Sequence, residues 1–194
     1  GRLMQEAVPA GIGGMAALMG LSAEDVAEVC AEAAQGEVVS PANLNGGGQI
    51  VVAGHVAAVN RAIDLAKARG AKRALALAVS APFHCALMSA AAEGLKQVLE
   101  PLTVQPLSVD LIPNVTAQAS QDHSQIKSLL FQQMTAPVRW EESMQQLAAL
   151  ACQAALEIGP GRVLSGLLKR IDASLSCASF GEPKNLNDIQ GHVA

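Results

Sequence analysis

The stretch Val79-Ser80-Ala81-Pro82-Phe83-His84-Cys85-Ala86-Leu87-Met88 decides how the rest of the chain is interpreted. It follows an apolar run, Leu75 to Val79, that is typical of a strand. Pro82 interrupts the run, and a helical pattern begins after His84. The order predicts an imidazole at the carboxyl end of a strand, where open α/β sheets hold their active sites.

The composition indicates a chain that can bury a core. Of 194 residues, 51% are hydrophobic but only 2% are aromatic, so alanine, leucine and valine must fill that core. A formal net charge of -4 without a basic block argues against a nucleic-acid partner. No apolar run approaches the roughly 20 residues of a membrane-spanning helix, so no membrane partner is expected. The four cysteines are widely spaced, which predicts free thiols in a reducing cytoplasm.

The residues before His84 predict a small subdomain over residues 11–80. Apolar runs and helical periodicities alternate there in the order β-α-β-β-α-β, which is the ferredoxin-like arrangement of an antiparallel sheet with two helices on one face. The expected strands cover residues 13–20, 38–45, 49–54 and 72–79, and the expected helices cover residues 22–36 and 56–70.

The residues after His84 predict part of a parallel α/β layer over residues 81–180, because helices and strands alternate there. Helical patterns cover residues 87–102, 126–134, 141–151 and 163–171, and strands are expected at 109–117, 154–158 and 175–180. Residues 1–10 read as the end of a helix, and residues 181–194 as a polar tail. An opening without Met, in the middle of a pattern, suggests a fragment.

His84 is the strongest candidate for a general base, since a neutral imidazole accepts a proton near pH 7. By position alone, a structural histidine is the commoner explanation. His55 is expected to cap a helix, and His123 and His192 lie in polar segments. No histidine pair has metal-ligand spacing, so no metal site is predicted.

A partner nucleophile for His84 is missing from the sequence. The G-x-S-x-G elbow does not occur. Cys85 is a poor candidate because adjacent residues point apart, and Ser80 and Ser165 lack the elbow context. Considered alone, the residues supply half of a site.

Two glycine clusters have ordinary structural explanations. Gly46-Gly47-Gly48 lacks the lysine and hydroxyl residue of a phosphate loop and is interpreted as a turn. Gly159-Pro160-Gly161 lies between a predicted strand and a predicted helix. Its amides could line a cleft, but a tight strand-to-helix turn explains it equally well.

Taken together, several segments resemble malonyl-CoA:acyl carrier protein transacylases of type II fatty acid synthesis. Their order and spacing match that family from Gly1 to about Ile171, and the set is specific although each member alone is weak. The segments are GRLMQEAVP (1–9), ANLN (42–45), QIVVAG (49–54), GAKRA (70–74), APFHCALM (81–88), NVTA (114–117), PVRW (137–140) and EIGPGRVL (157–164).

The resemblance implies a hydrolase-like large α/β subdomain with an inserted ferredoxin-like subdomain. It implies malonyl transfer from coenzyme A to the phosphopantetheine thiol of acyl carrier protein, through a seryl ester and without a further cofactor. His84 matches the family's general base, and the backbone carbonyl of Gln133 matches the group that orients it. Asn45 matches a residue of the substrate cleft, and Phe83 is compatible with a malonyl-selective pocket.

The resemblance also places three parts of the family's site upstream of Gly1. These are the serine elbow, the oxyanion hole and the arginine that pairs with the malonyl carboxylate, and Arg2 is not that arginine. The chain is therefore expected to be the C-terminal part of a cytoplasmic enzyme and inactive alone. Gly46-Gly47 stands where many members have a small residue and proline.

Two other functions stay open. A non-catalytic ferredoxin-like binding module would explain the missing nucleophile, and an acyltransferase domain of a polyketide synthase would share the same segments. For an acidic carrier protein, docking needs a local positive patch, although ordinary solvated charges are the commoner explanation. The two candidate groups are Lys67, Arg69, Lys72 and Arg73, and Arg162, Lys169 and Arg170.

Overall fold

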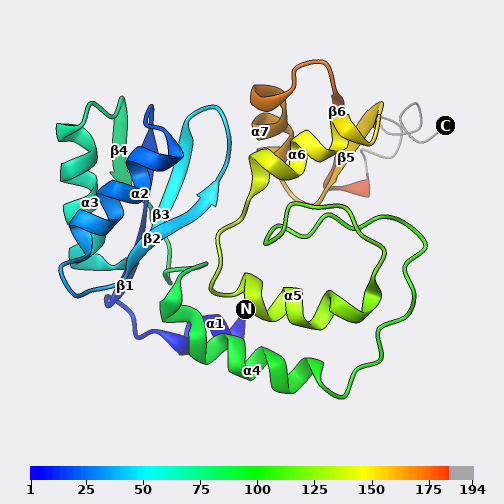
Figure 1. The fold of residues 1–194 in the computed structure, drawn as a ribbon, viewed down its shortest axis with the longest axis horizontal. Coiled ribbons are helices and arrows are strands. Elements are labelled where there is room, and N and C mark those ends of the chain that lie inside the picture. The colour runs from blue at the N-terminus through cyan, green and yellow to red at the C-terminus, as the bar shows by residue number, and fades with distance from the viewer. Residues whose placement is uncertain (184–194) are drawn as a thin grey trace.

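The computed structural model describes residues 1–183 of the chain. A subdomain built on a four-stranded sheet lies beside a second part that holds five of the helices and a two-stranded sheet (Figure 1). The elements are α1 (Arg2–Ala7), β1 (Gly13–Met19), α2 (Ala23–Ala34), β2 (Val39–Leu44), β3 (Gln49–His55), α3 (Val56–Ala68), β4 (Arg73–Ala76), α4 (Ser89–Leu99), α5 (Ile126–Gln133), α6 (Trp140–Ala149), β5 (Ala154–Ile158), α7 (Val163–Ile171) and β6 (Ser176–Phe180), with short 3₁₀ helices at Ala86–Met88 and His123–Gln125.

The predicted β-α-β-β-α-β order is confirmed. The strands lie in the order β2-β3-β1-β4, and each is antiparallel to its neighbours. Helix α2 connects β1 to β2, and α3 connects β3 to β4. This connectivity and strand order form the ferredoxin-like arrangement.

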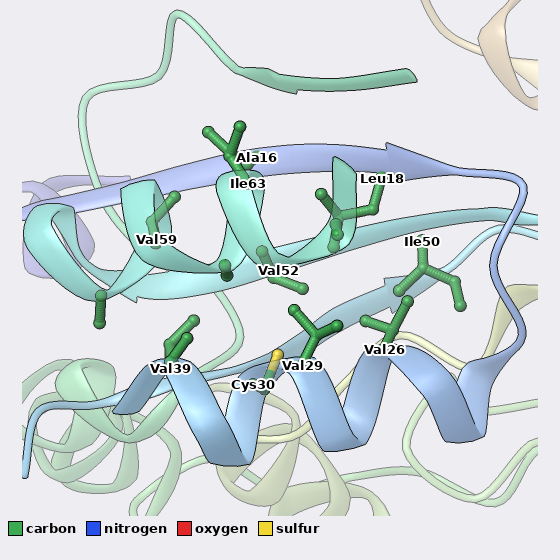
Figure 2. Packing of buried hydrophobic residues seen from close by; sticks show 14 residues of the cluster. Ala16, Leu18, Val26, Val29, Cys30, Val39, Ile50, Val52, Val59 and Ile63 are labelled. Carbon is green, nitrogen blue, oxygen red and sulfur yellow. The ribbon is translucent and has the colours of Figure 1, made fainter. Parts of the chain in front are cut away.

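One face of this sheet is covered by α2 and α3. Figure 2 shows Val26 and Val29 of α2 pointing toward the sheet, where Leu18 and Val52 lie. Each of these four side chains is at most 1% exposed, and burying one stabilises the fold by about 1.5–3 kcal/mol. Helix α2 begins at a capping box in which Ser22 and Asp25 satisfy each other's backbone N–H.

The opposite face of the sheet carries the segment around His84. Because strand residues alternate between faces, Met15 and Ala17 point away from the α2–α3 core. They form a second buried cluster with Cys85, against which Phe83 packs. The helix-free face of the small subdomain is therefore the platform for the candidate base.

The predicted strand before His84 is shorter than expected, and the expectation that His84 lies at its carboxyl end is wrong. Strand β4 ends at Ala76, and the last bond from this segment to β1 is donated by Leu77 N to Met15 O at 2.9 Å. The chain then leaves the sheet: Val79 N donates within the segment to Leu77 O at 3.0 Å, and Pro82 packs on Gly13 at the start of β1. His84 lies eight residues beyond the strand end, in a turn.

The strand predicted at residues 109–117 is also wrong. Within the described chain, this segment makes only an isolated bridge between Leu111 and Ser120. Pro113 lacks an N–H for a strand ladder, and its carbonyl instead accepts hydrogen bonds from the N–H groups of Thr116 and Ala117. Ala117 has a positive φ of 53° at the end of this turn.

The last elements confirm the predicted strand–helix alternation. Strands β5 and β6 are parallel, with Ala154 opposite Ser176 and Ile158 opposite Phe180, and α7 connects them. Gly159 and Gly161 have positive φ values of 136° and 88°, so Gly159-Pro160-Gly161 forms the tight strand-to-helix turn. Of the predicted polar tail, only residues 181–183 are within the described chain, and His192 lies outside it.

Glu157, near the end of β5, caps the N-terminus of α7. Its carboxylate accepts hydrogen bonds from the N–H of Leu164 at 3.0 Å and from the N–H of Ser165 at 2.8 Å. Only 8% of Glu157 is exposed. Burial raises the pKa of this carboxyl, but hydrogen bonds from the Ser165 hydroxyl and the helix N–H groups outweigh burial and leave the pKa below its usual range.

We expect Glu157→Gln to destabilise the protein by about 1.5–3 kcal/mol at pH 7, the usual range for hydrogen bonds to a charged group. Because the folded-state pKa is lowered, this stabilisation is fully present above the ordinary value of 4.5 and is lost as the pH falls through the folded-state pKa. Urea unfolding of both proteins between pH 3 and pH 7 measures it. The exposed Glu93→Gln is the control, and a constant difference across this range would contradict the assignment.

Candidate active site

His84 lies in a turn that buried neighbours hold in place. Pro82 and Cys85 are fully buried on either side of it. Pro82 packs so closely on Gly13 that a Cβ at this glycine would come within 2.3 Å of the proline ring. His84 itself has a φ of 61°, in the left-handed region that non-glycine residues seldom adopt, and such a conformation persists only where its surroundings impose it.

The half-buried imidazole of His84 contacts the end of α5. Its Nδ1 lies 3.0 Å from the backbone carbonyl oxygen of Gln133. A carbonyl can only accept a hydrogen bond, so the neutral ring carries its proton on Nδ1. The lone pair is then on Nε2, which has no hydrogen-bond partner among residues 1–183. This is the tautomer that a general base needs.

The segment that follows Gln133 is joined to the small subdomain through β2. Val138 N donates to Ala42 O, and Leu44 N donates to Val138 O, both at 2.8 Å. A register shift between Pro41 and Asn43 interrupts the β2–β3 ladder at Ala42. Such a bulge can aim a backbone group out of the ladder, here toward Val138. Strand β2 is the edge of its sheet, so its free side is open to this contact.

Arg139 connects the segment at residues 114–116 to the one that follows Gln133. Its backbone N–H donates to Asn114 O at 3.1 Å, and its Nη1 donates to Thr116 O at 3.0 Å. The guanidinium also bonds both carboxylate oxygens of Glu142, which holds the pKa of Glu142 below its usual range. Hydrogen bonds through residues 133–139 therefore link four of the segments that carry the resemblance. These segments lie around residues 42–45, 84, 114–117 and 137–140.

The other two predicted site residues lie near this junction. Asn45 directly follows the last bond between β2 and Val138, is half-buried, and donates its backbone N–H to Gln49 O. Phe83 packs against two buried clusters, one on the sheet and one formed by Val8, Ala81 and Met88. Their substrate-binding roles stay predictions.

The described residues do not supply a nucleophile for His84. Cys85 is fully buried, its Sγ donates to Pro82 O at 3.1 Å, and burial raises the pKa of the thiol. A buried thiol of raised pKa is a poor nucleophile. The Ser165 hydroxyl bonds the cap carboxylate of Glu157. Residues 1–183 also contain no group of three or more His, Cys, Asp and Glu side chains that could hold a metal ion.

Comparison with known proteins identifies the family. The family model described as the acyl transferase domain matches residues 1–179. The chain belongs to this acyl transferase family.

Two curated relatives of this acyltransferase chain are malonyl CoA-acyl carrier protein transacylases. The protein of Salmonella typhimurium is 46% identical over 187 residues, which is 96% of this chain and 60% of the relative. The protein of Bacillus subtilis is 44% identical over 187 residues, 96% of this chain and 59% of the relative. The acyltransferase chain thus spans about 60% of the length of these relatives.

Solved acyltransferase structures share the fold. An acyl carrier protein S-malonyltransferase from Vibrio cholerae matches with a TM-score of 0.93 at 46% identity, covering 97% of this chain and 62% of the other. A malonyl-transacylase in complex with a type II polyketide synthase acyl carrier protein matches with a TM-score of 0.93 at 45% identity, covering 98% and 62%. These matches confirm the α/β fold class. No helix within residues 1–183 is both long and apolar enough to span a membrane.

Two side chains of the candidate site were not predicted from the sequence. The PVRW segment predicts no separate role for Arg139, and the resemblance assigns a role to the carbonyl of Gln133 but not to its side-chain amide. Both side chains donate hydrogen bonds to backbone carbonyls. Arg139 donates to Thr116 O, and Gln133 donates to Ala136 O and Pro137 O. Hydrogen bonds of this kind leave no periodic or spacing signal in a sequence.

Proposed function

We propose that this chain provides the general base and part of the substrate cleft for malonyl transfer from coenzyme A to acyl carrier protein. The hydrogen bond from His84 Nδ1 to Gln133 O carries the proposal, because it leaves Nε2 of the ring ready to accept a proton. High identity to malonyl CoA-acyl carrier protein transacylases supports the choice of acyl group and acceptor. Acyl transfer between thioesters needs no cofactor beyond the thioester itself.

In the proposed mechanism, Nε2 of His84 removes the proton of a serine hydroxyl as the oxygen attacks the malonyl thioester carbonyl. The serine belongs to the part of the family fold that this chain does not contain. When the C–S bond breaks, the imidazolium returns its proton to the departing coenzyme A thiolate, leaving a malonyl-seryl ester. The phosphopantetheine thiol of the carrier protein then loses its proton to Nε2, attacks the ester, and displaces the serine, which is reprotonated.

A direct test uses a hybrid enzyme in which this chain replaces the aligned residues of the Salmonella typhimurium relative. Transfer of radiolabelled malonyl from malonyl-CoA to a phosphopantetheinylated carrier protein of fatty acid synthesis is the expected result. A folded hybrid that transfers nothing, as judged by circular dichroism and assay, would instead support the non-catalytic binding module.

A second candidate function is transfer to a polyketide carrier protein. It is favoured by the solved complex of a similar malonyl-transacylase with a type II polyketide synthase carrier protein. Comparing kcat/KM of the hybrid for carrier proteins of the two pathways separates these candidates, and a preference for the polyketide carrier would reverse the first choice. All four cysteines are free, which supports a cytoplasmic location for either reaction.

For carrier-protein docking, we propose the group that contains Arg162 and Lys169. In the first candidate group, Arg69 bonds Glu28 and Glu32 at 2.8 Å and Lys67 lies 3.6 Å from Asp64, so two of its four charges are paired with carboxylates. Arg162 and Lys169 are exposed and line one cavity, and neither has an acidic partner within residues 1–183.

We expect charge reversal at both Arg162 and Lys169 to raise KM for the carrier protein about two- to thirtyfold, from 0.2–1 kcal/mol per exposed charge pair. The kcat should change little, and the effect should shrink at high salt because these charges are exposed. Steady-state kinetics of the hybrid measure both quantities. Reversal of Lys67 and Arg69 is the control, and a larger effect there would move the docking surface to the small subdomain.

A further inference from the structure

The side chain of Gln133 braces the same turn whose carbonyl contacts His84. Gln133 is the last residue of α5, and its Nε2 donates to Ala136 O at 3.0 Å and to Pro137 O at 3.4 Å. Its backbone oxygen is the one that lies 3.0 Å from Nδ1 of His84. The backbone carbonyl of Gln133 therefore contacts the candidate base, and the side-chain amide of the same residue holds the turn that carries this carbonyl.

We propose that the amide side chain of Gln133 is a positioning residue for the general base, an inference that rests on the proposed function. The carbonyl oxygens in the last turn of a helix have no partner within the helix. Helix hydrogen bonds therefore do not fix the backbone conformation of the residues that follow. The Gln133 amide fixes that direction over residues 133–137. Val138, the next residue, is fixed to Ala42 and Leu44 of β2.

These contacts form a continuous path from the small subdomain to the imidazole. It runs from β2 through Val138 to the Ala136 and Pro137 carbonyls, then through the Gln133 side chain to its own carbonyl and His84. Without the amide, the Gln133 carbonyl could rotate away while Val138 stayed docked. The ring would then lose the acceptor that keeps its proton on Nδ1.

One atom of the Gln133 amide lowers stability instead of adding to it. The Oε1 atom of Gln133 is buried and has no hydrogen-bond partner among residues 1–183. An unsatisfied buried acceptor costs free energy, whereas methionine fills a similar volume without that atom. Gln133→Met should therefore fold while it removes both hydrogen bonds to the turn.

In the hybrid enzyme, we expect Gln133→Met to lower kcat for malonyl transfer about 10- to 100-fold, the size of loss that a small misplacement of a reacting group causes. The KM for malonyl-CoA should stay within about twofold, since the ring is not proposed to bind substrate. Gln132→Met is the matched control. This neighbouring glutamine is exposed, and its Nε2 donates to the Ser128 hydroxyl at 3.0 Å.

A second measurement is independent of activity. Long-range ¹H–¹⁵N spectra of the 194-residue chain report which ring nitrogen of each histidine carries the proton, and His84→Gln assigns the His84 signals. We expect the Nδ1–H form of His84 in the native chain and in Gln132→Met, and a shift toward the Nε2–H form in Gln133→Met. Gln133→Leu, which also lacks the N–H donors, should give the same shift and replaces Gln133→Met if that variant does not fold.

An unchanged tautomer in a folded Gln133 variant would overturn the proposal, whatever its kinetics. A tautomer shift with an unchanged kcat would also overturn it, because the amide would then orient a ring that does not limit transfer. If the hybrid with the native chain transfers no malonyl, the proposed function fails. The spectra would still decide whether Gln133 positions His84.

Discussion

His84→Ala in the hybrid enzyme should lower kcat/KM for malonyl transfer by about 10²–10⁴-fold, the usual contribution of a general acid–base group. The variant loses both the base that activates the serine and the acid that protonates the leaving thiolate. Nδ1 bonds Gln133 O, whereas Nε2 has no hydrogen-bond partner among residues 1–183. Radiometric transfer from malonyl-CoA to the carrier protein measures the loss.

The matched control is His123→Ala, which removes a histidine at the start of a 3₁₀ helix outside the hydrogen-bonded junction. Its activity should stay within about twofold of the parent hybrid, as expected for a site that touches neither substrate nor base. Equal losses in the two variants would indicate that any histidine replacement harms the fold. Unchanged transfer in His84→Ala would remove His84 from the mechanism.

Gly54→Ala should destabilise the small subdomain by more than about 4 kcal/mol, an exceptional value for one methyl group. Gly54 lies in β3 opposite Val39, and a Cβ there would be 2.0 Å from the backbone oxygen of Val38. The backbone of Val38 cannot retreat easily. Its oxygen accepts from His55 N at 2.8 Å, and its N–H donates to Nδ1 of His55 at 2.9 Å.

Urea unfolding followed by circular dichroism measures this loss. The control is Gly166→Ala in α7, where a new Cβ has no neighbour within 4 Å and φ is not positive. Alanine in a helix interior is better than glycine by roughly 0.5–1 kcal/mol, so Gly166→Ala should be slightly stabilising. A Gly54→Ala variant as stable as the parent would mean that β2 and β3 separate locally without cost.

The same contact shows what His55 does in place of the expected helix cap. His55 precedes α3 and was expected to cap it, but its side chain makes no cap hydrogen bond. Nδ1 instead accepts from Val38 N. A ring nitrogen that accepts from a backbone N–H is unprotonated, so His55 carries its proton on Nε2, the opposite tautomer to His84. Two histidines of one chain are thus distinguished by whether the backbone group they meet is a donor or an acceptor.

Local patterns determined much of this protein. Apolar runs and helical periodicities predicted the ferredoxin-like subdomain, because each depends on neighbours a few residues away. The ordered set of short segments was enough to indicate the transacylase family, and the acyl transferase match over residues 1–179 bears that out. The candidate base was also visible, as a histidine between a strand and a helix.

Contacts between distant segments decided the rest. Whether residues 109–117 form a strand depends on Pro113 and on the absence of a pairing strand within the described chain, which no local apolar pattern reports. The left-handed turn at His84 is imposed by the packing of Pro82 on Gly13, 69 positions earlier in the sequence. The meeting of Val138 with β2, and of Gln133 with His84, joins backbone groups that every residue possesses. Because such groups carry no residue-specific signal, only the tertiary structure could show which tautomer the base adopts and what holds it there.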